Sequence, residues 1–528
     1  RYIDDLQKGN ELPFSKIEYK NINNIMELNI STQNNLNLVP KRNEESKGTL
    51  LGVLDGCVTS IGSRELKKII KNPFLDIEKI KERQFYVDYF FNDVLLRENV
   101  REKLKDIYDI ERIAGKIIYG TENGKDLLSL KDSIRKSLET YKLLKEHQEL
   151  KKIFELDIEI LLDIYNKIEL IIDAEAPFSV REGGIIKDGY NSELDELRRI
   201  SKLGKDFILE IEQRERERTG IKGLKIKYNK VFGYFIEVTK ANEHLVPEDY
   251  IRKQTLVNSE RYIVPDLKEY EEKVITAKSK IEALEYELFK SLSSEIKEHI
   301  ESLYKLANRI ANLDIVSNFA HIATKNSYVK PEISEENILE IKGGRHPIVE
   351  SLIASGSYVK NDIVLDEKNN LIILTGPNMS GKSTYMKQVA LNIIMAHIGS
   401  YVAADYARIP IVDKIFTRVG ASDDLLTGQS TFMLEMTEVA SILNNATEKS
   451  FIVLDEIGRG TSTYDGISIA TAITEYIHNN IGAKTIFATH YHELTELEKE
   501  LERAINFRVE VKENGKNVVD RKSTRLNS

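Results

Sequence analysis

The chain has 528 residues, of which 41 % are hydrophobic and 30 % charged, and its formal net charge is −9. This length predicts several domains, and the acidic balance excludes a protein that coats DNA through overall basicity. The single cysteine, Cys57, excludes an internal disulfide framework and is typical of a reducing cytosol. The sequence contains neither an apolar run long enough to span a membrane nor a signal peptide, so we expect a cytoplasmic protein without a membrane partner.

The first two thirds of the chain have a mostly helical pattern. Apolar residues recur at three- and four-residue spacing in residues 63–72, 76–95 and 125–173, and a charged helical pattern runs from about 266 to 312. Such long helices are suited to connecting two distant functional parts. After Arg345-His346-Pro347 the pattern becomes α/β, with strands expected near residues 371–374, 411–419, 451–454 and 485–489.

A basic segment in the helical part suggests contact with DNA. Residues 214–230 hold seven Lys and Arg residues against Glu215 and Glu217, and a strand-like segment follows at Tyr234–Val238. Lys, Arg and Asn side chains on a small sheet would contact phosphates without reading the base sequence. The alternative is an ordinary solvated face of a charged helix. The predicted DNA contacts are Lys227, Asn229, Arg252, Lys253, Asn258 and Arg261.

The most informative segment is LIILTGPNMSGKST, residues 371–384, which reads as a buried strand followed by a phosphate-binding loop. Its residues fit the pattern G-x-x-x-x-G-K-[ST], in which backbone N–H groups cradle a phosphate chain at the start of a helix, here expected over Tyr385–Ala396. Lys382 would reach the phosphates and Ser383 would hold Mg²⁺. A glycine-rich surface turn would leave the Lys-Ser-Thr run unexplained. The predicted nucleotide contacts are Gly376, Pro377, Asn378, Met379, Ser380, Gly381, Lys382, Ser383 and Thr384.

Two further strands are expected to bring catalytic groups to this loop. The apolar run Phe451–Leu454 ends in Asp455-Glu456, where the first carboxylate can reach Mg²⁺ and the second can polarise an attacking water. The strand Thr485–Ala488 leads to His490, which could contact the γ-phosphate or the water. Taken alone, an acidic pair is often a solvated loop start and a histidine is more often structural, so the prediction depends on the strands converging.

Four motifs in order carry a family resemblance. TGPNMSGKST, residues 417–438, LDEIGRGTSTYDG (454–466) and FATHYHELT (487–495) resemble the ATPase domain of the MutS family of bacterial DNA mismatch-repair proteins. Upstream, residues 49–68 resemble the start of the family's core domain, and residues 214–238 and 252–271 resemble its DNA clamp. The resemblance covers roughly residues 20–515.

This resemblance implies a multidomain fold. A mostly α-helical core with long lever helices and a small α+β clamp is expected to precede an α/β P-loop ATPase domain of the ABC type. The implied ranges are the end of a connector domain (1–20), the helical core and lever (21–185), the clamp (186–268), the returning lever helices (269–335), the ATPase domain (336–519) and a non-family tail (520–528).

The resemblance also implies a function. The family implies a homodimeric, weak DNA-dependent ATPase that uses ATP and Mg²⁺, binds double-stranded DNA (mismatched DNA when full length), works with a MutL-type partner and lies at the nucleoid. Catalytic roles fall to Lys382, Glu456 and His490, and Mg²⁺ to Ser383 and Asp455. Ser430 would reach the γ-phosphate of the partner subunit, although it also suits an ordinary helix N-cap. Tyr358 would stack on adenine, the alternative being plain packing.

The chain departs from the family pattern at both ends. It begins at Arg1, so we expect the N-terminal mismatch-reading domain with its Phe-x-Glu motif to be missing, and this fragment not to discriminate mismatches by itself. Phe235-Ile236-Glu237 matches that triplet but lies in the clamp-like strand, which indicates coincidence. Residues 520–528, DRKSTRLNS, do not resemble the family, whose further ATPase strand and dimerisation helices are expected beyond, so dimerisation and ATPase activity of this chain are in doubt.

Two other functions are compatible with parts of the sequence. One is a MutS paralogue that acts on branched or recombination DNA without mismatch recognition; a downstream nuclease-like domain would favour it. The other is a structural ABC-type ATPase that bridges chromosomes, but that family has a Ser-Gly-Gly-Gln run and very long coiled coils. Here the corresponding residues are Gly428-Gln429-Ser430-Thr431, and the predicted helices are too short.

Overall fold

The fold is known from a computed structural model that describes residues 24–41, 44–229, 233–354, 356–377, 380–419, 431–514 and 517–525. The chain folds into two compact units. Unit 1 contains the described residues up to Ile107, residues 139–155 and those from Ala307 onward, and unit 2 contains Tyr108–Leu138 and Leu156–Leu306. Helices α8 and α12 contribute residues to both units.

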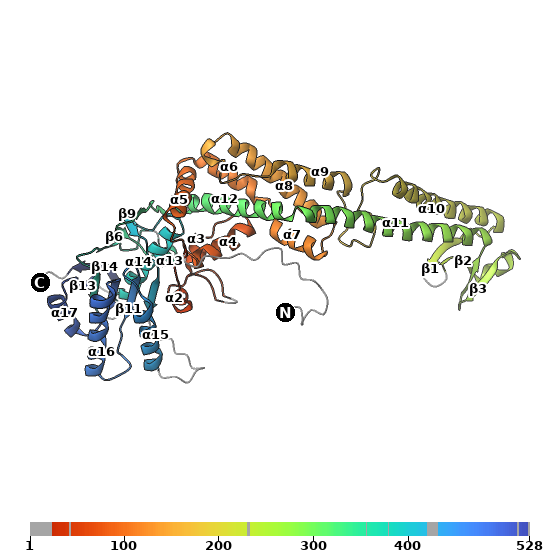
Figure 1. The fold of residues 1–528 in the computed structure, drawn as a ribbon. Helices are drawn as coiled ribbons and strands as arrows, with labels where there is room; N and C mark the ends of the chain where they lie inside the picture. The colour runs from red at the N-terminus through yellow and green to blue at the C-terminus, as the bar shows by residue number, and fades with distance from the viewer. Residues whose placement is uncertain are drawn as a thin grey trace. The chain divides into compact units, whose positions relative to one another are not determined.

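Unit 2 is built mainly from helices. Two of them, α10 and α11, run side by side over most of their length (Figure 1). Helix α10 begins after Asn191, whose side chain accepts a hydrogen bond from Leu194 N–H, and ends at Gly220 in the left-handed conformation. The helices of this unit are α7 (Ile110–Tyr119), α8 (Gly124–Lys145), α9 (Ile158–Ile171), α10 (Ser192–Thr219), α11 (Pro265–Glu298) and the start of α12 (Ile300–Asn326).

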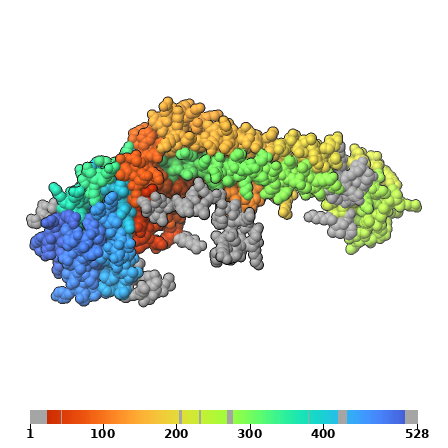
Figure 2. Space-filling model, in the orientation of Figure 1, coloured from red at the N-terminus to blue at the C-terminus, as the bar shows by residue number. Residues whose placement is uncertain are grey.

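A four-stranded antiparallel sheet lies at one end of the α10–α11 pair. Its strand order is β1-β2-β4-β3. One face packs on the helices through Ile211, Leu224, Ile236 and Leu267, all of them buried. Figure 2 shows the yellow-green atoms of this sheet gathered at the end of the helix pair. The strands are β1 (Lys225–Asn229), β2 (Gly233–Thr239), β3 (Ile251–Thr255) and β4 (Ser259–Ile263), and the 3₁₀ helix η3 spans Lys240–Leu245.

Unit 1 combines short helices with two sheets. Its N-terminal helices start at side-chain caps; for example, Thr59 accepts a hydrogen bond from Gly62 N–H at the start of α4. The helices before residue 155 are α2 (Ile30–Asn35), α3 (Leu50–Leu54), α4 (Ser60–Lys71), α5 (Ile77–Asn92), α6 (Val94–Lys105) and the short η2 (Gln148–Leu150).

The larger sheet of unit 1 has six strands in the order β10-β11-β12-β8-β13-β14. The first five are parallel and β14 is antiparallel to β13. β8 and β12 are buried along their whole length, as expected of central parallel strands. β8 is apolar up to Thr375, whereas β12 begins with Lys484 and Thr485 before its apolar residues. The strands are β8 (Leu371–Thr375), β10 (Ile415–Arg418), β11 (Phe451–Asp455), β12 (Lys484–Ala488), β13 (Ala504–Asn514) and β14 (Asn517–Arg525).

A smaller sheet and several helices complete unit 1. The sheet has the strand order β5-β9-β6-β7, formed by Glu332–Ser334, Tyr406–Pro410, Leu339–Gly344 and Asn361–Leu365. An apolar cluster that includes Leu371, Val439, Leu454 and Ile473 packs helices onto the larger sheet. The helices are α13 (Pro347–Leu352), α14 (Lys382–His397), α15 (Thr431–Asn445), α16 (Thr463–Tyr476), the π-helix η4 (Ile477–Ile481), the 3₁₀ helix η5 (His492–Glu496) and α17 (Leu497–Glu500).

The expectation of several domains that mix helices and sheets is confirmed, but four predicted elements are shorter than expected. The helix over 76–95 ends at Asn92, because Asp93 caps the next helix through Leu96 N–H. The pattern over 125–173 is interrupted between Lys145 and Ile158, and that over 266–312 breaks at His299. The expected strand 411–419 is reduced to β10, which begins at Ile415 and ends at Arg418.

The sequence predicts no segment that could span a membrane. Among the described residues, no helix combines the length and apolar character needed to cross a bilayer.

Candidate functional site

The loop between β8 and α14 turns on itself at two glycines. Gly376 has φ of 151° and Gly381 has φ of 98°, both in the region that favours glycine. A Cβ on Gly376 would lie 3.2 Å from Ser380 Oγ and 3.2 Å from the Val509 carbonyl oxygen, so β13 closes on the loop. Gly381 is the N-cap of α14 and makes no side-chain hydrogen bond to it, so the cap residue does not occupy the first N–H groups, which are the groups that bind anions at a helix N-terminus.

The Lys382 side chain lies inside this loop. Its Nζ donates hydrogen bonds to the carbonyl oxygens of Gly376 at 2.9 Å and Pro377 at 3.2 Å, and the residue is 5 % exposed. Burial lowers the pKa of the Lys382 ammonium, while the nearby Glu456 and Asp455 carboxylates act in the opposite direction. A buried cation whose hydrogen-bond acceptors among the described residues are two carbonyl oxygens is suited to meet a strongly anionic ligand.

Asp455 and Ser383 meet next to Lys382. Ser383 Oγ donates a 2.6 Å hydrogen bond to Asp455 Oδ2, joining the start of α14 to the end of β11. Asp455 Oδ1 is buried and has no hydrogen-bond partner among the described residues. Burial raises the pKa of Asp455. Two oxygen ligands side by side, with one carboxylate oxygen unused, form a donor set that fits a hard cation such as Mg²⁺.

The Glu456 carboxylate lies between the side chains of His490 and Arg459. Its Oε1 contacts His490 Nε2 and its Oε2 pairs with Arg459. The backbone of Glu456 is left-handed, with φ of 58°, and its N–H donates to the Ala488 carbonyl oxygen at 2.9 Å. A non-glycine residue in this conformation costs free energy, and such residues often occur at functional sites.

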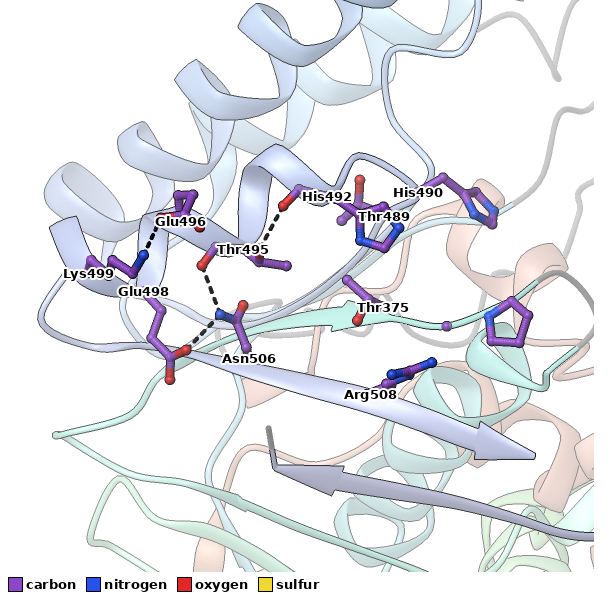
Figure 3. A pocket seen from close by; sticks show the side chains of 12 residues that line it. Thr375, Thr489, His490, His492, Thr495, Glu496, Glu498, Lys499, Asn506 and Arg508 are labelled. Carbon is purple, nitrogen blue, oxygen red and sulfur yellow. Dashed lines mark hydrogen bonds and ion pairs between the residues drawn. The ribbon is translucent and has the colours of Figure 1, made fainter. Parts of the chain in front are cut away.

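A cavity of about 850 Å³ opens beside the loop (Figure 3). Thr375 and Thr489 line it at the ends of β8 and β12, and Asn506 and Arg508 line it from β13. Asn506 Nδ2 donates to the Thr495 carbonyl oxygen at 2.8 Å and to Glu498 Oε2 at 2.6 Å. His490 therefore lies between the Glu456 carboxylate and an open space large enough for a ligand.

The sheet of unit 2 has two faces with different chemistry. Residues directly opposite each other on neighbouring strands lie on the same face of a sheet. Lys227 is opposite Phe235, and Glu237 is opposite Arg261. Both pairs therefore lie on the face away from the buried Ile236. We call the face formed by Lys225, Lys227, Phe235, Glu237 and Arg261 the cation face. The Arg261 guanidinium lies 4.4 Å from the centre of the Phe235 ring and donates to Gln254 Oε1 at 2.8 Å.

Arg252 points to the other face. It lies opposite Tyr262, and its Nη2 is 2.7 Å from Oε1 of the buried Glu260, which also accepts a hydrogen bond from the Tyr262 hydroxyl. The basic end of α10 is likewise paired with acids, since Arg218 bonds to Asp249 and to the buried Glu215. Lys253 and Asn258 are exposed on β3 and at its turn to β4.

Comparison with known proteins decides the family. A family model described as MutS domain III matches residues 31–320, and one described as MutS domain V matches residues 372–525. The chain belongs to the MutS family. The domain V match includes residues 520–525 of the segment that we expected to lie outside the family, and the structure places residues 517–525 in β14.

Individual relatives agree with this family. The chain is 92 % identical over 518 residues to the DNA mismatch repair protein MutS of Fusobacterium nucleatum subsp. nucleatum, covering 98 % of this chain and 58 % of that protein. It is 50 % identical over 525 residues to MutS of Caldicellulosiruptor bescii, covering 98 % and 61 %. It is 49 % identical over 530 residues to MutS of Clostridioides difficile, covering 98 % and 55 %. The chain therefore spans about three fifths of the length of these relatives.

The structure brings together most residues predicted for the nucleotide site. Lys382, Ser383, Asp455, Glu456 and His490 converge at the carboxyl ends of β8, β11 and β12, through the contacts given above. Ser380 is buried and its Oγ has no hydrogen-bond partner among the described residues, and Thr384 lies in the first turn of α14. Asn378, Met379 and Ser430 lie outside the described residues.

Tyr358 is attached to α14. Its hydroxyl donates to Gln388 Oε1 at 2.9 Å, and burial raises the pKa of this phenol. The half-buried ring is thus fixed to the helix that starts at Lys382. Its predicted role at adenine stays a prediction.

Sequence reasoning missed Arg459. This residue pairs with Glu456 and is half-exposed on the loop that follows β11. The available signal was its position three residues after the acidic pair, in the segment LDEIGRGT. It also missed Glu435, whose Oε1 accepts a 2.7 Å hydrogen bond from Gly458 N–H and so ties α15 to the same loop.

Proposed function

We propose that this MutS-family chain is the ATPase and DNA-clamp part of a mismatch-repair protein, and that it binds ATP with Mg²⁺ at the loop between β8 and α14. The observation that carries the proposal is the convergence of Lys382, Ser383–Asp455 and Glu456–His490 on one loop with a free helix N-terminus. An anionic phosphate chain would satisfy all of these groups together.

Each side chain then has a separate task. Lys382 leaves its two loop carbonyls and neutralises the β- and γ-phosphates. Ser383 and Asp455 would hold Mg²⁺, which supplies charge neutralisation to the phosphates when bound. Gly376, Pro377, Ser380, Gly381 and Thr384, with Asn378 and Met379, would shape the phosphate cradle.

Glu456 would orient and polarise the attacking water. Both of its oxygens are already paired, one with His490 and the other with Arg459. Hydrolysis therefore requires one of these contacts to open, and the exposed Arg459 is the partner that can leave at lower cost. His490 keeps the carboxylate in place and reaches the γ-phosphate side of the site.

The wider proposal concerns partners and coupling. Ser430 of one subunit would complete the site of a second subunit, and Tyr358 would stack on adenine. ATP binding would close a homodimer and change the grip of unit 2 on duplex DNA, and hydrolysis would reset it. A MutL-type partner would receive this signal. The "DNA mismatch repair protein" names of the relatives support the pathway, and the full-length relatives would add mismatch recognition.

Nucleotide binding and hydrolysis test the site separately. A fluorescent ATP analogue with Mg²⁺ should bind the chain, and Lys382→Met should weaken binding by about tenfold or more through loss of a buried charge partner. Glu456→Gln should retain binding while phosphate release falls by about 10²-fold or more. Lys368→Met, the same change at an exposed turn before β8, is the matched control and should alter neither quantity.

Three results would contradict the proposal or one part of it. Equal nucleotide affinity in the parent chain, Lys382→Met and Lys368→Met would mean that the loop is not the nucleotide site. Loss of nucleotide binding in Glu456→Gln, with an unchanged melting temperature, would mean that Glu456 serves binding rather than hydrolysis. If the parent chain binds nucleotide but releases no phosphate, the ATPase part of the proposal fails for this chain.

A further inference from the structure

The cation face has a carboxylate at its centre. Glu237 lies opposite Arg261 on one neighbouring strand and opposite Lys225 on the other. Its Oε1 is 3.0 Å from Lys227 Nζ, and its Oε2 is 3.7 Å from Arg261 Nε. One acidic side chain thus contacts two of the cations that we propose for DNA phosphates.

The two cations that contact Glu237 differ in how exposed their side chains are. The Arg261 side chain is 19 % exposed and is held by Phe235 and Gln254, whereas the Lys227 side chain is 53 % exposed. Arg261 Nε is buried and has no hydrogen-bond acceptor among the described residues. A small movement of Glu237 away from Lys227 and toward Arg261 would satisfy this donor. Glu237 therefore lies between two cationic partners, one held by neighbouring side chains and the other more exposed to solvent.

We infer that Glu237 competes with DNA phosphates for Lys227 and Arg261 and thereby limits the affinity of the cation face for duplex DNA. The inference rests on the proposed DNA-binding function of unit 2. A phosphate oxygen and a carboxylate oxygen make the same charge-assisted hydrogen bonds to lysine and arginine. When phosphate takes Lys227, the Glu237 carboxylate stays nearby and repels it.

This arrangement has a functional consequence. Sequence-independent affinity for DNA comes almost entirely from phosphate contacts, so the charge balance of the cation face sets how tightly it would hold duplex DNA. An internal carboxylate lowers that affinity without removing the cations that position the duplex. A phosphate contact of Lys227 would replace its ion pair with Glu237, so the net gain in free energy from that contact is small.

The test is the salt dependence of binding to a short homoduplex DNA by the whole chain. Glu237→Gln should bind about five- to tenfold tighter at low salt, since one nearby negative charge is removed. The slope of log K against log salt should also steepen by up to about 0.9, because the face then neutralises more phosphate charge. Glu237→Asp keeps the charge and should bind like the parent chain.

Three controls separate the possible causes. Glu248→Gln, the same charge change at an exposed residue of unit 2 outside the four strands, should leave affinity and slope unchanged. Lys227→Met should weaken binding, and the gain from Glu237→Gln should be smaller in this background. Melting temperatures of all variants report whether the sheet folds.

The outcomes are distinguishable. If Lys227→Met weakens binding but Glu237→Gln changes neither affinity nor slope, the inference is overturned and the proposed DNA-binding face stands. If neither Lys227→Met nor Glu237→Gln alters binding, the cation face is not the DNA site and both proposals fall. A gain in Glu248→Gln equal to that in Glu237→Gln would assign the effect to overall charge and also overturn the inference. If Glu237→Gln does not fold, Glu237→Ala, which also removes the negative charge, is measured in its place with the same expectations.

Discussion

At Glu456, the backbone and two neighbouring side chains together determine where the carboxylate lies. The left-handed φ of 58° turns the residue away from the path of β11, and His490 and Arg459 hold one carboxylate oxygen each. Asp455, one residue earlier, faces Ser383 instead. Adjacent residues at the end of a strand point in different directions, so two acids in sequence can take two roles: one for the cation and one for water.

At the residue scale, the buried His346 makes the stability of the fold depend on pH. Its Nδ1 accepts a 3.3 Å hydrogen bond from Val349 N–H at the start of α13, and burial lowers its pKa to about 4, with Lys387 acting in the same direction. The folded chain therefore binds fewer protons here than the unfolded chain, whose histidine pKa is about 6.5. Stability from this residue is present near pH 7 and falls as the pH drops from about 6.5 toward 4.

The prediction is a loss of about 2 kcal/mol of unfolding free energy from His346 between pH 7 and pH 5. In His346→Asn the side chain can still cap α13 but cannot titrate. Denaturant unfolding of both chains at pH 7 and pH 5 should show a smaller pH-dependent loss in the variant. An equal loss in the two chains would contradict a neutral, buried His346.

At the scale of elements, close packing of α16 holds the loop that carries Arg459. A Cβ on Gly466 in α16 would lie 2.4 Å from the Tyr491 hydroxyl oxygen and 2.5 Å from the Gly458 carbonyl oxygen. Tyr491 donates a 3.0 Å hydrogen bond to that same carbonyl. The glycine therefore permits the helix, the loop after β11 and the segment after β12 to meet.

Gly466→Ala should destabilise the chain by about 1–3 kcal/mol, because the added methyl group forces these segments apart. Gly115→Ala is the matched control: it is also inside a helix, α7, and nothing lies within 4 Å of the added Cβ. The control should be neutral or stabilising by about 0.5–1 kcal/mol. Thermal unfolding measures both variants, and equal stability of Gly466→Ala and the parent chain would show that the contact is not tight.

At the scale of the whole molecule, charge is distributed unevenly along the chain. The net charge of −9 opposes DNA binding, and we propose that the cation face and the exposed Lys253 provide local contacts to phosphates. Binding by such a face depends on phosphate contacts rather than on base recognition. The chain spans 58 % of the Fusobacterium nucleatum relative, so the DNA binding predicted below is that of this chain and not of a full-length protein.

We predict weak, salt-sensitive binding to duplex DNA that does not distinguish a homoduplex from a single-mismatch duplex and that changes when ATP and Mg²⁺ are added. The affinity should fall steeply with salt, by about 0.9 in log K per log unit of salt for each phosphate contact. Lys382→Met should bind DNA as the parent chain does but lose the ATP effect. A clear preference for the mismatch would mean that recognition resides in this chain, contrary to the domain assignment.

The linear sequence determined the family, the change from a helical to an α/β pattern and the residues of the loop between β8 and α14. Gly376, Gly381, Lys382 and Ser383 are close in sequence, and their pattern carries its own mechanism, so the loop could be predicted without a fold. The same holds for the buried strands β8 and β11, whose apolar runs are local signals. The signal is weaker for β12, which begins with Lys484 and Thr485.

Only the tertiary structure decided which side chains oppose one another. The Lys227–Glu237–Arg261 grouping depends on strand register, and Arg252 lies on the face opposite to Arg261 because of an irregularity in the pairing of β3 with β4. A shift of one residue moves a side chain to the other face, and the sequence does not specify such a shift. The pairing of Arg459 with Glu456 also required the three-dimensional structure. It depends on the left-handed backbone of Glu456, which the sequence pattern does not predict.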